Sequence, residues 1–338
     1  MTTTTELGFD EARYLRIQEG AVAAGLALAD ELGAARRDGA EELVFLGTGG
    51  ANLLMEPAVQ LLARHSSFPA QVRRSAEEVV DEAARLGPRS IVVMPSLSGT
   101  TTETLAVAEL ARGRGARLVA LVGREQTPLA ELSHATFVNE ALDDTSSESF
   151  FLQTMLGVLG LADTDGARRL GGELAQLPEL LTRAKRDIDG PAAGHAAFLA
   201  DADWHIFTGA GPAWTEAHYF AMCILEEMQW IRTRPVHAAD FFHGTLELVD
   251  EDVSVVVLKD ASAYRPMAER VEAFLADRTR RVLVLDAATS DLSALSPDAR
   301  GVAGPVVLAA QLERVAAHLE ILRDHPLTTR RYYKRVEY

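Results

Sequence analysis

Short apolar segments alternate with longer amphipathic segments in the first half of the chain. The apolar segments are at 43–46, 90–94, 117–122 and 135–138, and helix-like stretches such as 74–86 and 101–113 separate them. Short, continuous apolar runs are typical of strands that are covered on both faces. Strands that alternate with helices form a parallel sheet between two helical layers. We therefore predict an α/β fold that follows an opening helix over 11–35.

The same pattern begins again in the second half. Apolar runs at 205–208, 253–258 and 281–286 predict strands, and a long helical segment reaches about Trp230. The segments Phe45-Leu-Gly-Thr-Gly-Gly50 and Phe207-Thr-Gly-Ala-Gly211 resemble each other, since each is a strand followed by a glycine-rich turn. A structural unit that recurs along a chain indicates an internal repeat. Two tandem α/β domains are therefore expected, each a parallel sheet with helices on both faces.

Composition changes in the chain predict where the domains end. We expect an N-terminal helical segment (1–38), a first domain (39–165), a helical linker (166–192), a second domain (193–324) and a C-terminal segment (325–338). The linker is polar and charged and reaches the sequence Asp189-Gly-Pro191, which predicts the end of a helix.

Charge and cysteine content narrow the possible functions. The 338 residues include 33 Lys and Arg against 49 Asp and Glu, a net charge of −16 that disfavours nucleic acid and anionic membranes as partners. The single Cys223 allows no internal disulfide and favours a reducing compartment. The first residues do not resemble a signal peptide, and no apolar run approaches the ~18 residues of a membrane span. A cytoplasmic location is expected.

Hydroxyl side chains are concentrated in Met94-Pro-Ser-Leu-Ser-Gly-Thr-Thr-Thr-Glu103, between a predicted strand and a predicted helix. Backbone N–H groups at a helix start bind phosphate, and the side chains of Ser96, Ser98 and Thr101 add donors without any positive charge. The alternative is an ordinary helix cap, which needs only one hydroxyl. We favour a phosphate site.

Nucleotide-binding motifs match poorly. The third glycine of a dinucleotide fingerprint is replaced by Asn52 after the first glycine loop and by Trp214 after the second. The chain has only three lysines (Lys185, Lys259, Lys334), and none of them follows a glycine as in a phosphate-binding loop of the Walker type. Phosphoryl transfer from nucleotides is therefore disfavoured.

Two adjacent carboxylates, Glu226 and Glu227, end the long helical segment of the second half. At α-helical spacing, Glu227 has apolar neighbours on its face, whereas Glu226 has Gln229 beside it and is expected to reach solvent. Desolvation of a carboxylate raises its pKa and suits it to proton transfer near neutral pH. Glu227 is therefore the candidate base, and a glutamate that simply reaches water is the alternative.

A histidine-rich segment follows at 237–250. Its His237, Asp240 and His243 include the residue types of a metal site with two histidines and one carboxylate, but the spacing matches no familiar pair of ligands, and we expect no metal. His243 precedes Gly244 at a predicted turn and is a candidate acid or base at neutral pH.

These motifs together resemble the tandem sugar isomerase (SIS) domain family. Ser96-Leu-Ser-Gly-Thr-Thr101 matches its phosphate signature Ser-x-Ser-Gly-x-Thr, which includes Gly99. Residues Gly47, Thr48 and Gly49 match the glycine loop that approaches the sugar. Within the family, the chain most resembles the fructoselysine 6-phosphate and related fructosamine 6-phosphate deglycases, which are related to the isomerase half of glutamine–fructose-6-phosphate aminotransferase.

The resemblance also implies the catalytic residues. The family has a catalytic Glu sixteen residues before a His-Gly-x-Leu segment, as Glu227 and His243-Gly-Thr-Leu246 are here. Its histidine often comes from the neighbouring subunit, so a homodimer with its active site at the interface is implied. Lys334 matches a lysine in a C-terminal segment that closes over the substrate, although a basic, tyrosine-rich end alone would indicate disorder or docking. Ser146 and Ser147 align loosely with sugar-site residues.

The resemblance implies an enzyme without metal or organic cofactor that releases glucose 6-phosphate and an amine from a fructosamine 6-phosphate. The glutaminase domain of the aminotransferase and an N-terminal cysteine are lacking, so glutamine-driven amination is not expected. The second domain has Leu258-Lys-Asp-Ala-Ser262 in place of the serine loop, which implies one phosphate site per chain. The alternatives are a glucosamine 6-phosphate deaminase, an aldose–ketose phosphate isomerase and a non-catalytic sugar-phosphate sensor.

Overall fold

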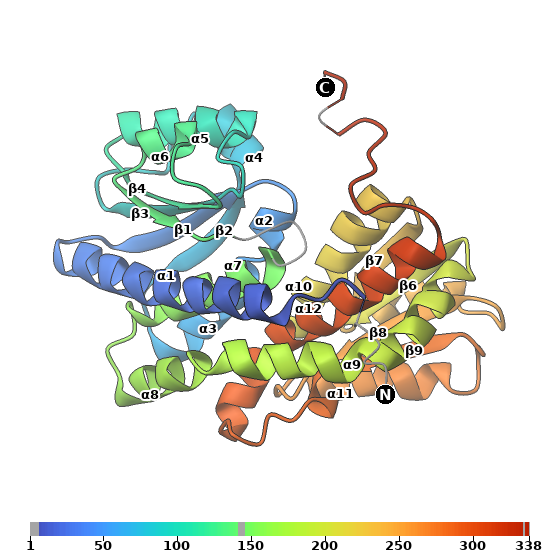
Figure 1. The fold of residues 1–338 in the computed structure, drawn as a ribbon. Coiled ribbons are helices and arrows are strands. Elements are labelled where there is room, and N and C mark those ends of the chain that lie inside the picture. The colour runs from blue at the N-terminus through green and yellow to red at the C-terminus, as the bar shows by residue number, and fades with distance from the viewer. Residues whose placement is uncertain (1–6, 141–145, 334, 338) are drawn as a thin grey trace. The chain divides into compact units, whose positions relative to one another are not determined.

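A computed structural model describes residues 7–140, 146–333 and 335–337, except for the side chain of residue 146. The chain forms two compact units (Figure 1). One contains Glu11–Glu179, and the other contains Leu180–Tyr338 together with Met1–Asp10. Among the described residues, no helix is both long and apolar enough to cross a membrane.

The first unit contains a parallel sheet of five strands in the order β2-β1-β3-β4-β5. The central strands are almost completely buried, as their continuous apolar sequences predict. The chain leaves β1 in one direction to reach β2 and returns to the other side of β1 to form β3, so the order of strands reverses between β1 and β3. The strands are β1 (Glu42–Gly47), β2 (Ala70–Arg74), β3 (Ser90–Pro95), β4 (Arg117–Val122) and β5 (Ala135–Val138).

Helices cover both faces of this sheet (Figure 1). Apolar side chains of α4 (Ser75–Val80), α5 (Thr102–Gly113) and α6 (Pro128–Leu132) form a core with one face of the sheet. The helices α1 (Glu11–Arg37), α3 (Glu56–His65) and α7 (Ser146–Leu159) lie on the other side. The short α2 (Gly50–Leu53) follows β1, and α8 (Asp165–Leu174) follows α7.

The second unit repeats this architecture with four parallel strands in the order β7-β6-β8-β9. Its strand order reverses between β6 and β8, at the place equivalent to β1 and β3. The strands are β6 (Trp204–Gly209), β7 (Arg232–His237), β8 (Ser254–Lys259) and β9 (Val282–Asp286). The helices are α9 (Leu177–Ala200), α10 (Pro212–Tyr219), η1 (Phe220–Gln229), α11 (Arg265–Leu275) and α12 (Pro297–Leu322), with short 3-10 turns η2 (Phe241–His243), η3 (Thr245–Leu248) and η4 (Ala287–Thr289).

The predicted α/β fold with two parallel sheets is confirmed, but three local predictions are wrong. The sequence pattern missed the edge strands β2 and β7, whose polar residues are only partly buried. The helix predicted over 74–86 ends at Val80. The helix predicted to end at Pro191 continues to Ala200, because proline removes only one hydrogen bond and Ala192, Ala196 and Leu199 remain buried beyond it.

Candidate active site

The serine-rich loop lies at the carboxyl end of β3, where the strand order of the first sheet reverses. Ligands of open parallel sheets bind at this position. The side chain of Ser96 is buried, and its Oγ accepts a hydrogen bond from Gly99 N at 3.1 Å. Ser98 Oγ accepts from Thr100 N at 3.3 Å and from Thr100 Oγ1 at 3.0 Å. The hydroxyls therefore shape a tight turn directly before α5.

The turn depends on Gly99, whose φ is +62°. A Cβ at this position would lie 2.5 Å from the side chain of Thr127, so both the backbone conformation and the available space require glycine. Leu129 N donates to Gly99 O at 3.2 Å and ties the loop to α6. The loop is thus fixed from two sides.

The start of α5 does not use the loop hydroxyls as a cap. Thr101 is the N-cap residue, but its side chain makes no capping hydrogen bond. The capping explanation of this hydroxyl-rich sequence is therefore not what the structure shows. Uncapped N–H groups at the start of a twelve-residue helix are suited to an anion such as phosphate.

The glycine loop after β1 borders the same edge of the sheet, because β1 and β3 are neighbours. Gly47 packs against the backbone of Asn52, and Gly49 has φ +58° and ψ −134°. The repeat in the second unit has the same conformation, with φ +55° and ψ −136° at Gly211. The internal repeat predicted from the sequence is thus reproduced at the level of single backbone angles.

The two glycine loops differ in the side chains that surround their glycines. Nothing lies within 4 Å of a Cβ built on Gly49, whereas a Cβ on Gly211 would collide with the ring of Tyr264. In the second unit, buried Asp260 follows β8 and accepts from Ser262 N at 2.9 Å. Burial raises the pKa of the Asp260 carboxyl, against the opposing effect of its hydrogen bonds. The first loop is open, and the second is filled by side chains.

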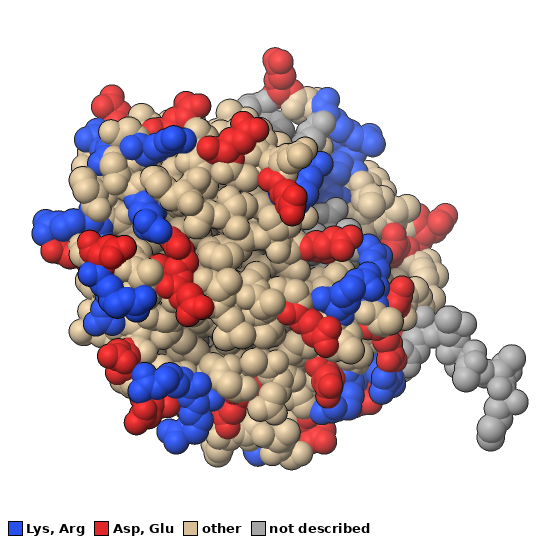
Figure 2. Space-filling model, turned by 60° about the vertical axis from the view of Figure 1, so that its left-hand side comes forward, with Lys and Arg blue, Asp and Glu red and all other residues tan. Residues whose placement is uncertain are grey.

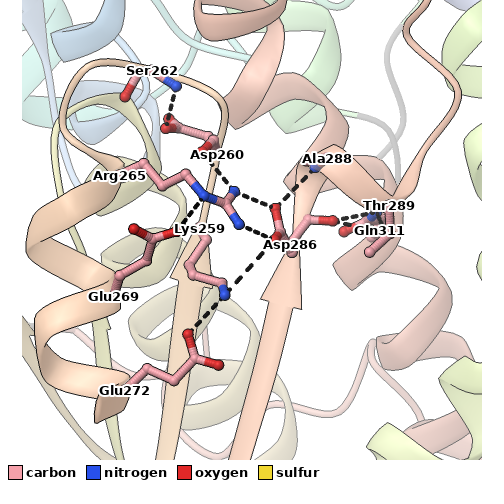
Figure 3. A network of polar contacts seen from close by, with 10 residues as sticks. All are labelled: Lys259, Asp260, Ser262, Arg265, Glu269, Glu272, Asp286, Ala288, Thr289 and Gln311. Carbon is pink, nitrogen blue, oxygen red and sulfur yellow. Dashed lines mark hydrogen bonds and ion pairs between the residues drawn. The ribbon is translucent and has the colours of Figure 1, made fainter. Parts of the chain in front are cut away.

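Charged groups beside this second loop are paired with one another (Figure 3). Lys259 Nζ lies 2.7 Å from Glu272 Oε2, and Arg265 donates to both carboxylate oxygens of Asp286 at 2.9 and 2.6 Å. Partial burial acts to raise the pKa of the Asp286 carboxyl, but the Arg265 guanidinium, the Ala288 N–H donor and the charge of Lys259 together lower it. This edge therefore contains an internal ion-pair network, in keeping with one phosphate loop per chain.

Glu226 and Glu227 lie on η1, a ten-residue π-helix that continues α10. π-Helical turns are rare and occur frequently at functional sites. The helix ends at Trp230 in the left-handed conformation, with φ +57°. Glu226 is exposed, as predicted, and accepts from Thr233 N at 3.2 Å.

Glu227 has a charged partner in addition to the apolar neighbours that the sequence predicted. Its side chain is 33% exposed, and Oε1 accepts a hydrogen bond from Arg330 Nε at 2.9 Å. The prediction assumed α-helical neighbours, but in a π-helix the hydrogen-bonded turn is longer by one residue. Its charge partner comes from a segment 103 residues away, which no local pattern reveals.

Residues 323–331 dock on the end of η1. Arg323 donates to the backbone and side-chain oxygens of Gln229, and Gln229 Nε2 donates to His325 O at 2.7 Å. The rings of Trp230 and His325 form an edge-to-face pair with centroids 4.4 Å apart. This part of the C-terminal segment is anchored on the helix that carries Glu227.

His243 is exposed at the end of the 3-10 turn η2, directly before Gly244 with φ +146°. Burial lowers the pKa of nearby His237. Within the described residues, no group of three or more His, Cys, Asp or Glu side chains is arranged to hold a metal ion. His243 is thus an exposed side chain at a turn of the second unit.

For three other predicted residues the structure gives few contacts. The hydroxyl of buried Ser147 donates to Glu148 Oε2 at 3.2 Å. Ser146 begins α7, but its side chain is outside the described part of the chain, as is the whole of Lys334. Sequence reasoning missed Arg330, and the only signal was the run of basic residues in the C-terminal segment.

Comparisons with known proteins identify relatives of this chain. The SIS domain model matches residues 39–161. Fructosamine deglycase FrlB of Bacillus subtilis (strain 168) is 32% identical over 306 residues, which cover 88% of this chain and 93% of the relative. Fructoselysine 6-phosphate deglycase of Escherichia coli (strain K12) is 27% identical, over 87% and 85% of the two chains. A Bacillus subtilis crystal structure described as a phosphosugar isomerase has a TM-score of 0.84 and 28% identity and covers 94% of this chain and 99% of its own.

Proposed function

Because the chain belongs to the SIS-domain family that includes the fructosamine deglycases, we propose that it is a fructosamine 6-phosphate deglycase. Such an enzyme converts the sugar phosphate and water to glucose 6-phosphate and a free amine. The observation that carries this proposal is the tight turn of Ser96 and Ser98 before the uncapped start of α5, to which the family resemblance adds Glu227 and His243 as catalytic residues.

The substrate phosphate binds the uncapped start of α5 and the hydroxyls of Ser96, Ser98 and Thr101. Gly47, Thr48 and Gly49 border the same edge of the sheet and contact the sugar. Backbone and hydroxyl donors bind the phosphate here without a cationic side chain, which suits a chain with a net charge of −16.

Figure 2 shows Lys and Arg next to Asp and Glu on one face of the molecule, and this face has no broad basic surface for nucleic acid.

Glu227 is the general base of the proposed reaction. It removes a proton from C1 of the open-chain fructosamine to give an enaminol, and return of a proton to C2 gives the C1 imine. Water adds to C1, and the carbon–nitrogen bond of the resulting carbinolamine breaks to release the amine. His243 transfers protons during ring opening and departure of the amine. Lys334 contacts the sugar or the closed C-terminal segment, and Ser146 and Ser147 are minor sugar-site candidates.

We further propose a homodimer in which His243 completes the active site of the neighbouring subunit. The support for this is the exposure of His243 and the resemblance to the family. We also propose the following domain boundaries. A first domain at 39–165 binds phosphate, a linker follows at 166–192, and a second domain at 193–324 carries Glu227 and His243. The proposed location of the protein is the cytoplasm.

The test is coupled detection of glucose 6-phosphate when the purified chain meets fructoselysine 6-phosphate, with unphosphorylated fructoselysine as the substrate control. Glu227→Gln should lower turnover by about 10²–10⁴-fold, because general acid–base terms have this size. Glu226→Gln is the matched variant and should keep most of the turnover. Near-normal turnover of Glu227→Gln would remove its assignment as the base.

Other outcomes would support the alternative functions. Release of ammonia from glucosamine 6-phosphate would indicate a deaminase, and interconversion of fructose 6-phosphate and glucose 6-phosphate without release of an amine would indicate an isomerase. Binding of sugar phosphates without turnover of any of them would indicate a sensor.

A further inference from the structure

An open pocket of about 740 Å³ lies beside Glu227, entirely within the second unit. Its volume is in the range of small-molecule sites. Aromatic side chains and arginines from η1, the start of β7 and the C-terminal segment form its walls: Trp230, Arg232, Arg330, Arg331, Tyr332 and Tyr333. The proposed chemistry of Glu227 does not account for this pocket.

Arg330 is held in a fixed position at the pocket. Its Nη1 donates to Leu327 O at 2.6 Å and to Thr329 O at 3.0 Å, and its Nε donates to Glu227 Oε1 at 2.9 Å. The side chain is only 15% exposed. Its Nη2 donates no hydrogen bond to any residue that the structure describes. A fixed guanidinium with remaining donors is suited to bind a carboxylate.

With two further arginines, the lining has three guanidinium groups against the two carboxylates of Glu226 and Glu227, which favours anions. The Arg331 guanidinium lies over the Trp230 ring at 3.9 Å from the centroid. Arg232, at the start of β7, forms no ion pair with the described residues. The pocket thus combines positive charge with aromatic walls, which is the chemistry that recognises an amino acid by its carboxylate and side chain.

Resting on the proposed function, we propose that Arg330 is a specificity-determining residue that binds the carboxylate of an amino acid linked to the sugar through its α-amino group. Only the nitrogen and the α-carbon separate C1 from the carboxylate group in such a substrate. Glu227 acts at C1, and the Arg330 guanidinium contacts Glu227. The guanidinium therefore lies close to the position that an α-carboxylate takes when C1 is at Glu227. In a lysine linked through its side chain, the carboxylate lies several bonds further from C1.

The same contact links substrate recognition to catalysis. A carboxylate that is ion-paired with arginine is a weaker base than one without a charged partner. When the substrate carboxylate takes over Arg330, Glu227 loses this ion pair and becomes a stronger base for the C1 proton. The Arg330–Glu227 pair thus lowers activity toward amines that lack a carboxylate.

The test compares two nearly isosteric substrates, the 6-phosphates of fructosylglycine and fructosylglycinamide. The wild-type protein should show kcat/KM about 10- to 100-fold higher for the carboxylate, the size expected for a charged bidentate contact. Arg330→Gln should bring this ratio close to one, mainly by loss of kcat/KM on the carboxylate substrate. Arg335→Gln, in the same segment but outside the pocket, should keep the wild-type ratio.

Each other outcome has a defined meaning. Equal loss on both substrates in Arg330→Gln would overturn the proposal and show a purely structural role. Absence of a carboxylate preference in the wild type would also overturn it, while activity on both compounds would leave the deglycase function intact. Failure to cleave any fructosamine phosphate would instead defeat the proposed function itself. Arg330→Lys, which keeps the charge but not the planar fork, should show an intermediate ratio if Arg330→Gln does not fold.

Discussion

Gly99 shows how a single residue fixes the backbone conformation of the proposed phosphate loop. It combines a left-handed backbone with close packing against Thr127, and it lies between the two serines and the start of α5. The motif therefore needs glycine at this position, because the backbone there has a positive φ. The hydroxyls can converge only because the chain turns at Gly99.

Substitution Gly99→Ala should destabilise the protein by about 1–3 kcal/mol, because alanine must adopt φ +62° and its Cβ meets Thr127. It should also raise KM for the sugar phosphate, since the loop has to move. Urea unfolding and steady-state kinetics measure the two effects. The control is Gly87→Ala, where a Cβ has open space and φ is not positive, and which should leave both quantities nearly unchanged. A normal KM in Gly99→Ala would show that the loop does not bind the phosphate.

Among the elements, η1 differs most from the sequence-based prediction. Its helical character was predictable, but the π-helical winding was not, because winding depends on what packs at the end of the helix. Here Gln229 is completely buried and bonded to Arg323 and His325, and Trp230 pairs with His325. The C-terminal segment and η1 therefore stabilise each other, and Arg330 reaches Glu227 as a result.

Substitution Gln229→Ala should lower the free energy of unfolding by about 1–3 kcal/mol, because buried donors and acceptors lose their partners. It should also loosen residues 323–331, so that trypsin cleaves after Arg330 and Arg331 more rapidly. Chemical denaturation and a time course of limited trypsin digestion measure these effects. Gln176→Ala is the control, because Gln176 is exposed and bonds only within its own helix region. If the two variants were digested at the same rate, Gln229 would not anchor the segment.

At the scale of the whole molecule, both units of the repeat contribute residues with proposed binding or catalytic roles. Ser96, Ser98 and Thr101 belong to the first, and Glu227, His243 and Arg330 belong to the second. The two halves of the repeat differ at their glycine loops. One glycine loop is open, whereas Tyr264 and Asp260 fill the other. The open space in front of Gly49 is therefore not repeated in front of Gly211.

The proposed homodimer predicts complementation between two inactive variants. Glu227→Gln and His243→Ala should each be nearly inactive alone. After mixing, unfolding and refolding together, random pairing should restore about a quarter of the wild-type activity, because half of the dimers are mixed and each of these has one intact site. Activity measurements before and after subunit exchange test this. Lack of recovery in dimers shown to be mixed would mean that His243 acts within its own chain.

The sequence by itself determined the strands buried on both faces, the repeat, the hydroxyl-rich loop between β3 and α5 and the exposure of Glu226. These are local properties, since short apolar runs and glycine-dependent turns are encoded by neighbouring residues. Only the tertiary structure decided the polar edge strands, the π-helical winding at Glu227 and the continuation of α9 beyond Pro191. The Arg330–Glu227 pair is the clearest case: its partners are 103 residues apart, and packing of the C-terminal segment on η1, rather than any local preference, brings them together.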